Sequence, residues 1–166
     1  MPSPFDVPPG CAFAARCHEL TSFLVDTLGR ADVAAALGAR AGTRIITPGG
    51  RLDPDELSWV GATAVDAVRA FRADVAVLGV CGWDVNVGLT SSVLEDAEVK
   101  RAVLGSAART VAVATGDKLG RSATFVVCAS GAIDALVVDH LDETARDALL
   151  AAGVEVVLAE RDRSPR

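Results

Sequence analysis

The run DVAVLGV, residues 74–80, constrains the fold of this chain more than any other stretch. After Asp74 it is apolar throughout, with no polar residue at alternate positions. A strand with one face in water alternates apolar and polar side chains, whereas a strand buried on both faces stays apolar. The run therefore predicts a central strand of a parallel sheet that is covered on both sides.

The segments around this run alternate between strand and helix patterns. A helix that starts at Ser92 is supported by Glu95 three residues later, the spacing of a capping box. Alternation of this kind favours a Rossmann-like α/β fold, with a mainly parallel sheet flanked by helices. The pattern predicts strands over 22–25, 43–50, 74–80, 110–115, 124–130, 134–139 and 154–160, helices over 30–40, 62–72, 92–108 and 142–153, and a short extended connector over 55–61.

Length and composition narrow the class of protein. The 166 residues suit one domain, and 51% of them are hydrophobic, with only 4% aromatic. The net charge of −6 and the lack of any Lys/Arg run argue against direct binding to DNA. Four cysteines without a CxxC pair and only two histidines predict neither a metal site nor a disulfide framework. No signal peptide or membrane-length apolar run is present, so we expect a cytoplasmic protein.

The segment from Cys81 to Thr90 follows the central strand and is rich in glycine and polar residues. Ligands of open α/β sheets bind beyond the carboxyl ends of the strands. Gly82 and Gly88 would let backbone amides approach a ligand, and Asp84 could accept hydrogen bonds from sugar hydroxyls. The amides leading into the next helix suit an anion. An ordinary strand-to-helix turn explains the same residues equally well.

Two further segments carry basic residues near expected strand ends. Lys118 lies in TGDKLGRSA, residues 115–123, where it could neutralise a phosphate or be an ordinary surface lysine. Because the loops after neighbouring parallel strands open on one edge, Lys118 and Asp84 are expected to lie close together. Arg51 follows Gly50 and is interpreted as a solvated charge beside Asp53 and Asp55 rather than an anion contact.

The remaining chemically active side chains predict no catalytic residue and no cofactor. Cys81 has no histidine near it in the sequence, so it is interpreted as inert. His18 and His140 are isolated and are interpreted as structural or surface residues. The acids Glu95, Asp96 and Glu98 fit a solvated first helical turn, where negative charge suits the helix dipole.

The order of these motifs closely resembles the sensor domain of DeoR-family bacterial transcription regulators. The likeness extends over roughly residues 21–160 and includes the segment IITPGGRLDPDELSWVG. The matching residues are Gly49, Gly50, Gly61, Asp74, Gly79, Gly82, Asp84, Gly88, Leu89, Thr90, Glu95, Lys100, Arg101, Lys118, Gly120, Asp134 and Asp139.

The resemblance implies a fold shared with ribose-phosphate isomerase and glucosamine-phosphate deaminase. It implies a homo-oligomeric sensor of phosphorylated sugars or related metabolites that lacks enzymatic activity and acts on DNA through an attached helix-turn-helix domain. By the same resemblance, Asp84 and the turn Gly88-Leu89-Thr90 would face the sugar. Lys118 would lie beside the ligand, and Gly82 and Gly50 would complete the site.

The chain departs from the family pattern near its start. The family's Gly-Thr-Thr phosphate loop has Gly10-Cys11-Ala12 as its nearest counterpart, without the hydroxyls. The expected organisation is a loose leader over 1–18 as a remnant of the first strand and phosphate loop, a sensor domain over 19–160 and a tail over 161–166. No room is expected for the DNA-binding domain.

Two other functions fit the sequence as alternatives to the sensor. The first is a sugar-phosphate isomerase or deaminase of the same fold, with Asp84 as general base and Lys118 as its electrostatic partner. The second is an interaction module that only oligomerises.

Overall fold

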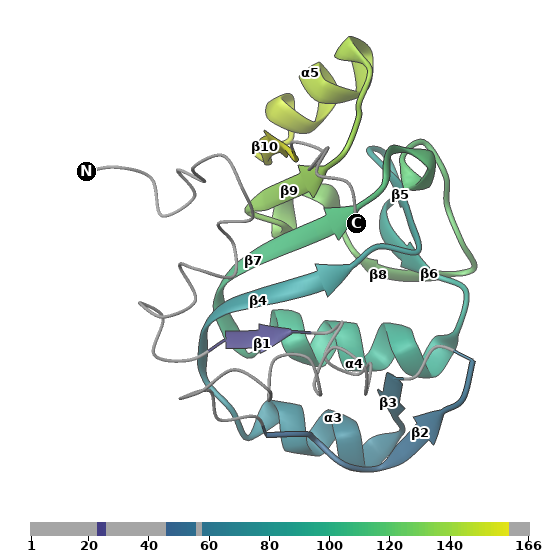
Figure 1. The fold of residues 1–166 in the computed structure, drawn as a ribbon, viewed down its shortest axis with the longest axis vertical. Coiled ribbons are helices and arrows are strands. Elements are labelled where there is room, and N and C mark those ends of the chain that lie inside the picture. The colour runs from purple at the N-terminus through teal and green to yellow at the C-terminus, as the bar shows by residue number, and fades with distance from the viewer. Residues whose placement is uncertain (1–22, 26–45, 56–57, 160–166) are drawn as a thin grey trace, which may run out of the picture.

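A parallel sheet of five strands forms the centre of the fold (Figure 1). The computed structural model describes residues 23–25, 46–55 and 58–159, the first range as backbone only. Each neighbouring pair of strands is parallel, which confirms the predicted sheet type. The strands, in their order across the sheet, are β1 (Phe23–Val25), β4 (Ala73–Gly79), β7 (Ala107–Ala114), β9 (Ala135–Val138) and β10 (Glu155–Leu158).

The strand β4 lies inside the sheet, between β1 and β7, and is buried on both faces, as its apolar run predicts. Ala76 and Leu78 belong to the larger apolar core. Val75 and Val77 belong to a second cluster, which they form with Val111 and Ala135. Side chains of a strand alternate between its two faces, so each cluster marks one face of the sheet.

Three α-helices are present in the described part of the chain. The helices α3 (Ala62–Arg69) and α4 (Leu94–Leu104) lie side by side along one face of the sheet, and α5 (Glu143–Ala151) lies beside β10 (Figure 1). The α5 helix begins as the sequence predicts, because Asp142 accepts a hydrogen bond from the Ala145 amide at 2.7 Å. No helix among the described residues is long and apolar enough to cross a membrane.

The start of α4 differs from the predicted capping box. Its N-cap residue is Val93, and no side chain caps it. The hydroxyl of Ser91, rather than of Ser92, accepts a hydrogen bond from the Val93 amide at 3.2 Å. The helix also ends at Leu104, earlier than predicted.

The segment after β4 is a hairpin rather than the predicted loop. Its strands β5 (Gly82–Asp84) and β6 (Gly88–Ser91) are antiparallel, and β8 (Phe125–Cys128) pairs with β6 to complete a three-stranded sheet. The predicted strand at 124–130 therefore belongs to this small sheet and not to the parallel one. The hairpin closes because Asp84 accepts hydrogen bonds within its own turn and Gly88 adopts a φ of 97°.

A second hairpin precedes α3. It consists of β2 (Arg51–Asp53) and β3 (Ser58–Val60), which are antiparallel. Residues 46–50 are irregular, so the strand predicted over 43–50 is wrong where it is described. The Pro-Gly-Gly turn that the sequence places at its end agrees with the positive φ of Gly49 and Gly50. The predicted connector at 55–61 contains β3. The predicted helix 30–40, the leader 1–18 and the tail 161–166 lie outside the described residues.

Candidate functional site

The loop that follows β7 is joined to the hairpin that follows β4. The Gly120 amide donates a hydrogen bond to the Trp83 carbonyl oxygen at 2.9 Å, and Trp83 and Leu119 form a parallel bridge. Lys118 and Asp84 each lie one residue from this bridge. Figure 1 shows β5 and β6 beyond the arrowheads of β4 and β7. The two predicted loops therefore meet at the carboxyl edge of the parallel sheet, as expected from the topology.

Thr90 is a buried residue at the junction between the β5–β6 hairpin and the Lys118 loop. Its side chain is fully buried, and its hydroxyl donates to the Gly82 carbonyl oxygen at 3.0 Å and accepts from the Ala123 amide at 2.8 Å. A Cβ atom on Gly82 would lie 3.0 Å from the Arg121 carbonyl oxygen and 3.1 Å from the Thr90 hydroxyl. Gly82 and Thr90 thus form the packed contact between the hairpin and the Lys118 loop.

One carboxylate oxygen of Asp84 forms hydrogen bonds within its own hairpin. Its Oδ1 atom accepts hydrogen bonds from the amides of Asn86, at 2.9 Å, and Val87, at 3.2 Å. This arrangement is an Asx turn, which fixes the orientation of the carboxylate. The side chain is only partly buried, and Asp84 directly follows Trp83, the residue that the Lys118 loop contacts.

Lys118 ends the short 3-10 helix η2 (Gly116–Lys118) and keeps a substantial exposure, with 43% of its side chain accessible. Its Nζ atom lies 3.8 Å from the Asp117 carboxylate. Asp117 also accepts a hydrogen bond from the Thr115 hydroxyl, which is the main reason that its pKa is lowered, with the charge of Lys118 adding to the effect. The loop therefore presents a lysine ammonium next to an ionised acid.

Asp139 anchors the start of the same loop from the end of β9. Its Oδ1 atom accepts hydrogen bonds from the Gly116 amide at 2.8 Å and from the amide and Nδ1 of His140, both at 2.9 Å. The bond from Gly116 is the main reason that the pKa of Asp139 is lowered. A Cβ atom on Gly116 would lie 2.4 Å from the His140 carbonyl oxygen, so only glycine fits there. His140 is 67% exposed, which agrees with a surface role.

Three further residues of the predicted site, Gly88, Leu89 and Gly50, pack closely against the rest of the fold. Leu89 is fully buried in the core, and a Cβ atom on Gly88 would lie 2.0 Å from the Cys128 carbonyl oxygen. Gly50 lies against Val60 and Ala64 rather than in the junction. The structure therefore brings Gly82, Thr90, Asp84 and the Lys118 loop together, whereas Gly50 contacts a different part of the fold.

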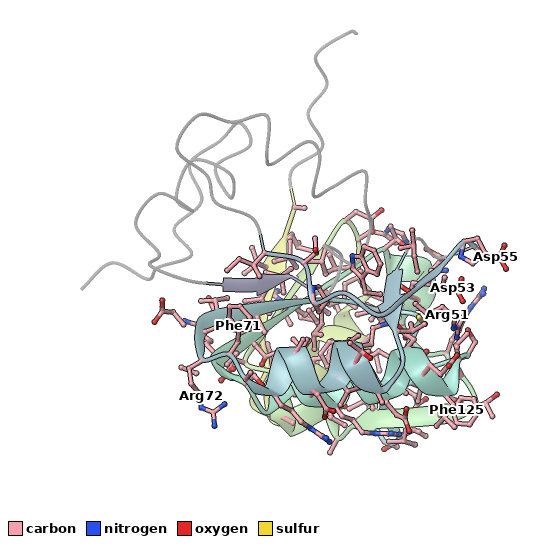
Figure 2. The ribbon with its side chains drawn as sticks, turned by 90° about the horizontal axis from the view of Figure 1, so that it is seen from below. Arg51, Asp53, Asp55, Phe71, Arg72 and Phe125 are labelled. Atoms are coloured by element: carbon pink, nitrogen blue, oxygen red, sulfur yellow. The ribbon has the colours of Figure 1, made fainter. Side chains whose placement is uncertain are left out.

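Arg51 is an exposed charge, as predicted, but Glu95 is a closer partner than Asp53. It forms a hydrogen-bonded ion pair with Glu95 at the start of α4, and its other partner is Asp53 at 3.9 Å. The bond to Glu95 raises the pKa of Arg51. Figure 2 shows Arg51, Asp53 and Asp55 gathered at the end of the molecule opposite Arg72.

A buried polar cluster beside the site is absent from the sequence-based prediction. Lys100 is 4% exposed and donates to the Asp96 carboxylate at 2.7 Å and to the Cys81 sulfur at 3.5 Å. The Ser91 hydroxyl donates to the same carboxylate at 2.6 Å. The prediction that Asp96 is solvated is therefore wrong, because α4 turns this face towards the sheet. The i,i+4 spacing of Asp96 and Lys100 is the signal that could have found the pair.

Comparison with known proteins identifies the family. The family described as the DeoR C terminal sensor domain matches residues 23–140. The HTH-type transcriptional repressor GlcR of Bacillus subtilis is 29% identical over 140 residues, which cover 84% of this chain and 53% of that protein. The HTH-type transcriptional regulator GlpR of Haloferax volcanii is 34% identical over 110 residues, or 66% of this chain and 43% of that protein.

The glycerol-3-phosphate regulon repressor of Escherichia coli K12 is 28% identical over 108 residues, covering 65% of this chain and 43% of that protein. The chain thus spans about half the length of the curated relatives that it matches. The family match covers most of the chain and includes the whole junction between the hairpin and the Lys118 loop. The chain belongs to the DeoR family, as a C-terminal sensor domain.

Proposed function

We propose that this chain is the effector-sensing domain of a DeoR-like transcription regulator and that it binds a phosphorylated sugar or a related metabolite without converting it. The observation that carries the proposal is the junction in which Lys118 and Asp84 flank the bridge between Trp83 and Leu119. The relatives are described as transcriptional repressors and regulators, which supports a regulatory role. In this proposal a separate domain of the regulator contacts DNA, and the sensor domains associate into a homo-oligomer.

The chemistry of the two charged side chains differs in a way that suits such a ligand. The exposed ammonium of Lys118 attracts the anionic group, and the oriented carboxylate of Asp84 accepts hydrogen bonds from sugar hydroxyls. Buried residues of the hairpin pack behind these groups and hold the backbone in place. They are Gly82, Gly88, Leu89 and Thr90. Gly50 is left out of the proposed site, because it lies against Val60 and Ala64 and not in the junction.

The description of the relatives as transcriptional repressors favours a sensor over the isomerase or deaminase alternative. Two backbone hydrogen bonds hold Oδ1 of Asp84, and its other oxygen would accept a sugar hydroxyl in a sensor or a substrate proton in an enzyme. An assay of the purified chain with ribose 5-phosphate and glucosamine 6-phosphate checks this point. Steady turnover of either compound that is lost in Asp84→Asn would contradict the sensor assignment.

Calorimetric titration tests the binding itself. The probes are glycerol 3-phosphate, glucose 6-phosphate and fructose 1-phosphate, together with the unphosphorylated glycerol, glucose and fructose. We expect at least one phosphorylated probe to bind and its unphosphorylated partner to bind much more weakly. Failure of all the phosphorylated probes, with an unphosphorylated one binding, would overturn the proposed ligand class.

Two substitutions, one at Lys118 and one at Asp84, test whether the probe binds at the junction. Lys118→Ala is expected to weaken binding of the phosphorylated probe at least about tenfold, which corresponds to about 1.4 kcal/mol. Arg146→Ala, which removes an exposed charge from α5, is the matched control and is expected to change little. Asp84→Asn keeps an acceptor oxygen for the turn, so a loss of affinity without a loss of stability would mark the carboxylate as a ligand contact.

A further inference from the structure

We propose that two buried hydroxyls, those of Thr90 and Ser130, are positioning groups that set where Lys118 lies relative to Asp84. The inference rests on the proposed function, because it concerns the same junction. Neither hydroxyl is placed to meet a ligand, since Thr90 is fully buried and Ser130 is 5% exposed. Each instead connects backbone segments that are distant in the sequence.

Thr90 connects the hairpin to the far end of the Lys118 loop. Its hydroxyl uses its one hydrogen on the Gly82 carbonyl and accepts the Ala123 amide, at 3.0 and 2.8 Å. The Gly120 amide binds the Trp83 carbonyl between these two points. The stretch that follows Lys118 is therefore fastened to β5 and β6 at two places.

Ser130 fixes the residues on either side of Asp84. Its hydroxyl accepts a hydrogen bond from the indole Nε1 of Trp83 at 2.8 Å and donates to the Val85 carbonyl oxygen at 3.0 Å. Trp83 is 1% exposed, so the indole has lost contact with water and needs this partner. Since the Trp83 carbonyl oxygen also accepts the Gly120 amide, a shift of Trp83 would change how the Lys118 loop lies against the strand that carries Asp84.

Loss of either hydroxyl leaves buried backbone or indole groups unpaired. A buried polar group without a hydrogen-bond partner is costly in free energy. The backbone segment that carries it therefore tends to shift until the group finds another partner or water. The segment that can respond is the loop after Lys118, which has no helix or strand of the main sheet to hold it. If the hydroxyls have a purely structural role, their loss should destabilise the whole fold evenly. If they position the loop, their loss should destabilise mainly the loop after Lys118.

Amide hydrogen exchange on the unliganded full chain separates these two roles. Thr90→Val, which keeps the shape and removes the hydroxyl, is expected to speed exchange at Gly120 and Ala123 at least about tenfold, the size expected for one lost buried hydrogen bond. Amides of β4 and β7 should keep their rates, and Thr90→Ser should restore the loop. Unchanged loop rates, or an equal rise throughout the sheet, would overturn the proposal.

Trp83 gives a second readout for Ser130. The chain has two tryptophans, so Trp59→Phe leaves Trp83 as the single indole fluorophore. In that background Ser130→Ala is expected to shift the emission of Trp83, because the indole loses its hydrogen-bond partner. An unchanged spectrum would contradict the role of Ser130.

Titration with the phosphorylated probes completes the test. Thr90→Val and Ser130→Ala are expected to weaken binding at least about fivefold while each variant stays folded, and Thr90→Ser is expected to bind like the parent. Equal affinity in parent and Thr90→Val would overturn the proposal. If the parent itself binds none of the probes, the proposed function fails, and the exchange rates still decide whether the hydroxyls position the loop.

Discussion

The Asp96 carboxylate lies 2.7 Å from the Lys100 ammonium, and 16% and 4% of the two side chains are exposed. Removing one partner of such a buried pair leaves the other charge unpaired in a poorly solvated place, which costs about 3–5 kcal/mol. Lys100→Met is therefore expected to lower the free energy of unfolding by about that amount. Urea unfolding followed by far-UV circular dichroism measures it.

The control for this prediction is an exposed helical pair. Asp66 and Arg69 on α3 lie 3.7 Å apart and are 75% and 67% exposed. Arg69→Met is expected to change the stability by less than about 0.5 kcal/mol, since water and salt screen such pairs. If Lys100→Met had no larger effect than Arg69→Met, the buried pair would not stabilise the fold.

Gly88 is expected to tolerate no side chain. It has a φ of 97°, and a Cβ atom would lie 2.0 Å from the Cys128 carbonyl oxygen, a backbone atom that cannot rotate away. Gly88→Ala should therefore separate β6 from β8 and lower the free energy of unfolding by more than about 3 kcal/mol. Gly105→Ala is the matched control, because Gly105, which follows α4, has a negative φ of −72° that alanine adopts readily, and its Cβ would have ordinary contacts at 3.6 Å. That variant should be neutral or slightly more stable.

The parallel sheet could be predicted from local patterns alone. The run from Val75 to Gly79 is apolar because both faces of β4 are buried, and this property is visible in the sequence. The cap at Asp142 is equally local, since donor and acceptor are three residues apart. The meeting of the Lys118 loop with the hairpin that carries Asp84 followed from topology, because parallel strands end on one edge.

The small antiparallel sheet could not be predicted in the same way. Its strands β5 and β6 are three and four residues long, too short to show a periodic pattern, and their third partner β8 is distant in the sequence. The bond between Trp83 and Ser130 spans 47 residues. The burial of Asp96 depends on which face α4 turns to the sheet. These features arise from tertiary packing, which a single sequence does not display.

Asp139 is expected to couple the Lys118 loop to pH in the acid range. The Gly116 amide stabilises the ionised carboxylate, so the folded pKa lies below the ordinary value of 3.8. The stabilisation is fully present above the unfolded pKa and is lost as the pH falls through the lower folded value. The NMR shift of the Gly116 amide should therefore titrate with a midpoint below 3.8.

Asp139→Asn should abolish this titration at Gly116. The Gly105 amide donates to the Arg101 backbone carbonyl instead of to an acid, and it serves as the internal control. A midpoint at or above 3.8 for Gly116 would show that the hydrogen bond does not favour the ionised form. A titration that persists in Asp139→Asn would assign the effect to another group.

Cys128 is expected to react slowly with thiol reagents in the folded chain. It lies in β8, and burial raises the pKa of its thiol from the ordinary value of 9.0 to about 11. Because the thiolate is the nucleophile, the two-unit rise lowers the reactive fraction at pH 8 about a hundredfold. The variant that isolates this thiol carries serine in place of the other three cysteines, Cys11, Cys17 and Cys81.

Alkylation of that variant by iodoacetamide at pH 8, followed by mass spectrometry, gives the rate for Cys128 alone. The same variant unfolded in concentrated guanidinium chloride is the reference, because its thiol then regains the ordinary pKa. We expect the folded chain to react at least about a hundredfold more slowly, and the difference to shrink as the pH rises from 9.0 towards 11, where the folded thiol also ionises. Comparable rates in the two states at pH 8 would mean that the Cys128 side chain is open to solvent in the folded chain. In that case the pairing of β6 with β8, which holds the backbone around Gly88 and Leu89 in place, would be weaker than the structure indicates.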